Sequence, residues 1–106
     1  MKGAGGLQQL MRQANQMQNR MKKLQAELAE REYEASSGGG AVSVKLKGES
    51  TITEIRISAD VMQAEDTEML QDLIMTAVNE ALKTAKTTAS QEMEKVTGGF
   101  NLPGLF

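Results

Sequence analysis

The N-terminal quarter of the chain carries basic side chains and no acidic one before Glu27. The basic residues of this segment are Lys2, Arg12, Arg20, Lys22 and Lys23. Such cations can bind a polyanion, because each one that meets a phosphate releases counterions without needing a particular base sequence. The whole chain is mildly acidic, with a net charge of −2, but its charge is polarised: residues 1–26 carry +5 and residues 60–82 carry −6. The basic segment is therefore the first candidate for a binding site.

Two further cations, Lys83 and Lys86, follow the acidic segment and are weaker candidates for the same role. A simpler interpretation remains open for all of these residues. Lys and Arg often only keep a helix solvated, or pair with carboxylates on a neighbouring helix. The residues alone do not decide between a binding face and a solvated one.

Other kinds of chemistry are poorly supported. The chain has no cysteine, no histidine and only three aromatic residues, so the commonest nucleophiles, general bases and metal ligands are missing. The glycines at 38–40 lack the Lys-Ser/Thr pair of a phosphate loop and are better explained as a turn. The carboxylates Glu65, Asp66, Glu68 and Asp72 suit a helix N-terminus, where the dipole favours negative charge. We therefore expect no catalytic residue, metal, cofactor or small-molecule substrate.

A long N-terminal helix must position the basic residues. Apolar residues recur there at steps of three and four, the a/d spacing of a coiled-coil seam, and the cations lie off that seam. The seam consists of Leu7, Leu10, Ala14, Met17, Met21, Leu24 and Leu28. Residues 1–6 contain three glycines and are expected to be a flexible arm rather than helix.

Three short strands should follow the helix. Residues 32–37 and 41–47 alternate in polarity on either side of the glycines. Residues 51–57 alternate after a hairpin-length connection, with Thr53, Ile55 and Ile57 expected on one face and Ile52, Glu54 and Arg56 on the other. The pattern predicts a three-stranded antiparallel meander with one apolar face.

A second long helix should cover that face. Asp66 or Thr67 is a plausible N-cap, apolar residues recur at helical spacing from Leu70 to Ala85, and Gly98 and Gly99 mark the end. A short helical turn is expected near residues 60–62, and residues 100–106 are expected to be a flexible end. The resulting fold class is α+β, with residues 1–106 forming one domain.

The length of the chain and its apolar stripes also bear on assembly and location. Two long helices and three strands leave apolar residues and two sheet edges uncovered, so a homodimer is favoured over packing within one chain alone. No apolar run is long enough to span a membrane, and no signal sequence is evident. We expect a cytoplasmic protein without a membrane partner.

The ordered set of features resembles the YbaB/EbfC family of bacterial nucleoid-associated proteins. The resemblance is carried by LMRQANQMQNRMKKLQAELAE, YEASSGGGAVSVKLKG, EMLQDLIMTAVNEALKTA, and KVTGG followed by LPG. It implies a tweezer-like homodimer that binds double-stranded DNA with weak sequence preference in the nucleoid, and no enzymatic activity. By charge, the contacts map onto Lys2, Arg12, Arg20, Lys22, Lys23, Lys83 and Lys86. The alternative is a coiled-coil protein-interaction or chaperone-like module that does not bind DNA directly.

Overall fold

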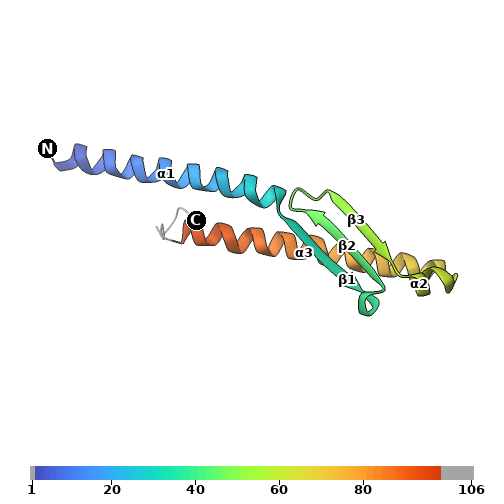
Figure 1. The fold of residues 1–106 in the computed structure, drawn as a ribbon. Coiled ribbons are helices and arrows are strands. Elements are labelled where there is room, and N and C mark those ends of the chain that lie inside the picture. Colours follow the sequence, from blue (N-terminus) through green and yellow to red (C-terminus); the bar gives the residue numbers. More distant parts are fainter. Residues whose placement is uncertain (1, 99–106) are drawn as a thin grey trace.

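Two long helices and a three-stranded sheet form the part of the chain that the computed structural model describes: residues 2–98, with side chains from residue 5 onward (Figure 1). The predicted order of elements is confirmed, and the expected flexible end at 100–106 lies outside the described residues. The elements are α1 (Lys2–Glu30), β1 (Glu32–Ser37), the 3-10 turn η1 (Gly38–Gly40), β2 (Val42–Lys47), β3 (Ile52–Ile57), α2 (Ala59–Gln63) and α3 (Thr67–Thr97).

Helix α1 begins at Lys2 rather than at Leu7. The expectation that residues 1–6 are not helical is therefore wrong for residues 2–6, and residue 1 lies outside the described residues. Glycine disfavours a helix by about 1 kcal/mol relative to alanine. That cost is tolerated because the seam residues nucleate the helix, and each further residue then adds a hydrogen bond without a new nucleation step.

The core lies between the sheet and α3. The strands are antiparallel in the order β1-β2-β3, and α3 packs mainly on β1 and β2. Alternation along β2 places Val42, Val44 and Leu46 on one face, where all three are fully buried. Opposite them α3 presents Ala77, Ala81 and Ala85, small residues that allow the helix to approach the sheet closely. The predicted apolar face is confirmed.

Strand β3 departs from the predicted alternation. A bulge shifts the register so that Lys45 pairs with Glu54 but Leu46 pairs with Ile52. Because directly opposed residues share a face, Ile52 lies on the same face as Leu46, and its predicted place on the polar face is wrong. Ile52 and Ile55 are each 44% exposed, since β3 lies beyond the strands that α3 covers.

Caps and turns complete the frame. Ser58 accepts a hydrogen bond from the backbone N–H of Val61 at the start of α2, and Asp66 caps α3 by accepting one from Met69 (3.0 Å). Buried Ser37 donates to the Leu73 carbonyl (2.6 Å), which ties β1 to α3. Within residues 2–98, no helix is long and apolar enough to cross a membrane.

Candidate nucleic-acid interface

Helix α1 is anchored at its C-terminal end and extends past α3 at its N-terminal end (Figure 1). Leu28 is buried, while Met17, Met21 and Leu24 are half-buried. The two helices run antiparallel and line a common cavity of about 280 Å³, which includes Leu28 of α1 and Ala85 of α3. The seam predicted from the sequence thus packs on α3 over its second half only.

The β2–β3 hairpin holds the C-terminal end of α1. The backbone N–H of Gly48 donates to the Arg31 carbonyl (2.9 Å), and that of Glu49 donates to the Ala29 carbonyl (3.2 Å). These bonds satisfy carbonyls that a helix end leaves without partners. A Cβ at position 48 would overlap the backbone carbonyl of Leu28, so the approach requires glycine.

An ion pair reinforces this junction. The Lys47 ammonium lies 3.2 Å from a Glu30 carboxylate oxygen, and this hydrogen bond, together with the charge of Glu30, raises the pKa of Lys47 above its usual value. Both groups are accessible to water, so the pair orients the hairpin more than it stabilises the fold.

Four basic residues of α1 lie off the apolar seam. At about 100° per residue, they spread over roughly 160° of the helix surface, from about 90° (Arg20) to about 170° (Arg12) from the mean direction of the seam. All four are exposed, and they lie within residues 12–23, a rise of about 17 Å along the helix. No carboxylate lies in α1 before Glu27. The face comprises Arg12, Arg20, Lys22 and Lys23, hereafter the basic face.

Ion pairing separates the basic residues of this protein into two groups. Within the part of the chain whose side chains are described, neither the basic face nor Lys83 and Lys86 form an ion pair within 4.0 Å. Every other described cation does. Those paired cations are Arg31, Lys45, Lys47, Arg56 and Lys95.

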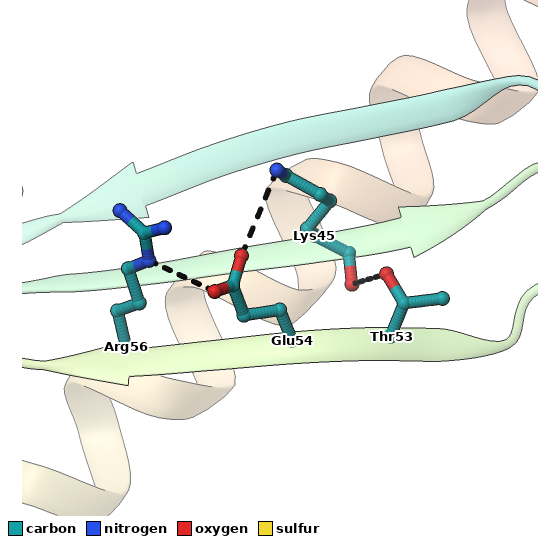
Figure 2. Close-up of polar contacts among 4 residues, drawn as sticks. All are labelled: Lys45, Thr53, Glu54 and Arg56. Carbon is teal, nitrogen blue, oxygen red and sulfur yellow. Dashed lines mark hydrogen bonds and ion pairs between the residues drawn. The ribbon is translucent and has the colours of Figure 1, made fainter.

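The outer face of the sheet shows how such pairing neutralises charge. Figure 2 shows Glu54 between Lys45 and Arg56, with distances of 3.6 Å and 3.0 Å from the carboxylate oxygens to the two cations. The hydrogen bond and charge of Arg56, followed by Lys45, lower the pKa of Glu54, and Glu54 raises the pKa of Arg56. Thr53, in the bulge, donates to the Lys45 carbonyl (3.2 Å). These cations already have a partner within the protein.

Comparison with known proteins decides the family. The model of the YbaB/EbfC DNA-binding family matches residues 2–100. The chain belongs to this family. Among curated relatives, a nucleoid-associated protein of Alkaliphilus metalliredigens is 53% identical over 106 residues, covering 100% of this chain and 93% of the relative. One from Clostridium novyi is 52% identical, with the same coverage.

A solved structure supports the fold of this YbaB/EbfC member. An uncharacterized protein from Helicobacter pylori matches with a TM-score of 0.62 at 24% identity, covering 83% of this chain and 95% of that one. At this identity the match speaks for the fold alone.

The remaining predicted site residues occupy different places in this YbaB/EbfC fold. Lys83 and Lys86 are exposed on α3, near the level of Ala85, which shares a cavity with Leu28 at the end of α1. They therefore lie beyond the C-terminal end of the basic face. Lys2 is the first residue of α1, and its side chain lies outside the described part of the chain.

Sequence reasoning missed the residues that hold the end of α1 and so set the direction of the helix that carries the basic face. The sequence pattern places Gly48 only in the hairpin-length connection before the third strand, although it is the point where α1 rests on the sheet. It places Tyr33 only in the first strand, although Tyr33 is buried beneath the same junction and its hydroxyl has no hydrogen-bond partner among the described residues. The glycine between Lys47 and Glu49 was the available signal, but a glycine in a hairpin has a sufficient local explanation.

Proposed function

We propose that this protein is a nucleoid-associated protein that binds double-stranded DNA as a homodimer, mainly through phosphate contacts of the basic face. One observation carries the proposal: the four cations of the basic face have no ion-pair partner among the described residues, whereas the described cations outside the predicted set are all paired. Membership in a DNA-binding family and the names of its relatives agree with it. Such a protein acts in the bacterial cytoplasm, on the nucleoid.

The geometry favours contact with the DNA backbone rather than reading of bases. A straight helix that carries cations over about 17 Å can follow a line of phosphates. The face presents flexible Lys and Arg side chains and no aromatic residue between them. Contacts of this kind position a protein on the duplex but carry little sequence information.

A homodimer would double the basic face and cover apolar residues of β3. Strand β3 is an edge of the sheet, and Ile52 and Ile55 are both exposed on its core-facing side. An exposed edge strand with apolar side chains favours pairing with another chain. We expect Ile55→Glu to lower the mass measured by sedimentation equilibrium, while Arg56→Glu, its neighbour on the polar face, retains the dimer.

The DNA-binding test compares two triple variants of equal charge. Arg20→Ala/Lys22→Ala/Lys23→Ala removes cations of the basic face, and Lys45→Ala/Arg56→Ala/Lys95→Ala removes three paired cations. Both take the net charge from −2 to −5. The first should weaken binding to unrelated duplexes alike and reduce the slope of log K against log salt by about 2.7 per chain, if each cation contacts one phosphate.

The second triple variant should bind DNA nearly as tightly as the wild type does, because the three cations that it lacks form ion pairs with carboxylates of the protein. If both variants lose affinity equally, net charge governs binding and the basic face is not the site. If neither does, the assignment to α1 fails. Oligomeric state is recorded in the same buffers, so that loss of the dimer is not mistaken for loss of a contact.

A further inference from the structure

The apolar seam of α1 is covered along one half of the helix and bare along the other. Leu7, Leu10 and Met11 are 59%, 51% and 58% exposed, and Ala14 is exposed as well. From Met17 onward the seam residues are half-buried, and they end in buried Leu28. Large apolar side chains exposed singly are ordinary, but a contiguous row of them indicates a surface that something covers.

The change in exposure coincides with the end of α3. Helix α3 runs back along α1 and its last turn lies beside the middle of α1 (Figure 1). Met93 of α3 lines the cavity that includes Gln25 and Ala29, and α3 ends four residues later at Thr97. In an antiparallel pair, Thr97 is then roughly level with Met21. Met17 is still half-buried, so the bare part of the seam begins at Ala14, within about two helical turns of the end of α3.

The chain that follows α3 has a composition suited to that bare strip. Residues 99–106, whose structure lies outside the described residues, contain no charged side chain and four large apolar ones. These are Phe100, Leu102, Leu105 and Phe106. The segment also contains Pro103, a residue type that disfavours helix at the position before it.

The length of the segment is also sufficient. Leu7 lies about 21 Å beyond the level of Met21 along α1. Eight residues in extended form span about 26 Å. The segment starts at the covered end of the strip and can reach its far end.

We propose that residues 99–106 of the same chain dock on the seam of α1 between Leu7 and Ala14. In this arrangement the segment continues the cover that α3 provides and leaves the basic face, which lies off the seam, open. It also denies the strip to a second copy or to another protein. The inference does not depend on DNA binding, since it concerns the apolar seam and not the basic face.

A cysteine pair tests the contact directly, because the natural chain has no cysteine. Leu10→Cys/Phe106→Cys should form a disulfide within one chain under mild oxidation, at a rate independent of protein concentration. The matched control is Gln8→Cys/Phe106→Cys, because Gln8 lies at a similar height but about 160° around α1 from Leu10. The control pair should oxidise more slowly.

Equal oxidation rates for the two pairs would overturn the proposal, because they would mean that the segment has no preferred place. A predominant disulfide between chains, seen as a band of twice the mass on a non-reducing gel, would overturn it in favour of a second copy.

A labelling experiment gives an independent readout. The single variant Leu10→Cys should react with a thiol reagent about threefold faster or more in a chain that ends at Gly98 than in the full chain, because removal of the segment uncovers the strip. Gln8→Cys should react equally in both. If Leu10→Cys also reacts equally in both chains, the segment does not cover the seam.

Discussion

Replacing Gly48 with alanine should both destabilise the protein and weaken DNA binding, although position 48 carries no charge. The added Cβ would lie 2.9 Å from the carbonyl carbon of Leu28, which is 0.5 Å inside ordinary contact, and it would overlap the carbonyl oxygen. Both atoms belong to the backbone, so rotation of a side chain cannot relieve the clash. Helix α1 and the hairpin must therefore separate.

The cost follows from what that separation breaks. The two hydrogen bonds from Gly48 and Glu49 to the end of α1 contribute about 1 kcal/mol each, and overpacking adds about 1–3 kcal/mol. We expect a loss of roughly 3–5 kcal/mol, which for a domain of this size lowers the Tm by about 15–25 °C. The basic face begins about 8 Å from Leu28 and extends to about 24 Å, so a small change of angle at the hairpin is magnified along it.

The assay is thermal unfolding followed by circular dichroism at fixed protein concentration, together with DNA binding at a temperature where the variant is folded. Gly39→Ala is the control: it is strained by a φ of 67° but meets nothing within 4 Å, so about 1 kcal/mol is expected. A Gly48→Ala variant that unfolds within about 2 °C of the wild type would refute the close contact between Gly48 and the end of α1, since the loss of even one hydrogen bond should lower the Tm by more than that.

Three further predictions test contacts and elements of the fold. Ser37→Ala removes the donor to the Leu73 carbonyl and should cost about 1–2 kcal/mol in urea unfolding, and an unchanged midpoint would contradict that role. Gly5→Ala, which meets nothing within 4 Å in α1, should raise helicity and stability by up to about 1 kcal/mol, whereas no gain would argue against a helical start. Because the pKa of Glu54 is lowered in the folded state, the stability that Glu54 contributes is present above its usual pKa of 4.5 and is lost as the pH falls through the lowered pKa. Glu54→Gln should therefore reduce the pH dependence of the free energy of unfolding in that acidic window.

Most of the fold could be predicted because its signals are local. The alternation of Val42, Val44 and Leu46, the carboxylate of Asp66 at a helix start, and the paired glycines after Thr97 each dictate one element by sterics or hydrogen bonding. The errors arose where a distant partner or cooperativity outweighs local preference. Residues 2–6 join a helix that the seam nucleates, and the bulge that turns Ile52 inward depends on the pairing of β3 with β2.

For the candidate site too, one part could be predicted from the sequence and another depends on the fold. That the cations of α1 lie off the seam follows from helical spacing alone. That the basic face has no ion-pair partner among the described residues does not, because pairing depends on which carboxylates the fold brings near. Glu54 forms ion pairs with Lys45 and Arg56 because of the register of the strands. Glu92 forms ion pairs with Arg31 and Lys95 where α3 passes the end of α1. Residue spacing along the sequence does not indicate that the paired cations are the ones that were not predicted to bind DNA.

The acidic net charge is compatible with DNA binding because of where the negative charge lies. The carboxylates of residues 60–82 belong to α2, to the connection after it and to the first half of α3, at the far end of a molecule 77 Å long from the free end of α1 (Figure 1). At physiological ionic strength the Debye length is about 8 Å, so these charges act weakly on a phosphate held at the basic face. They act more strongly on whatever approaches α2, where like charge disfavours a polyanion such as DNA. Polarised charge thus favours binding through α1, a preference that neutralising the acidic end should reduce.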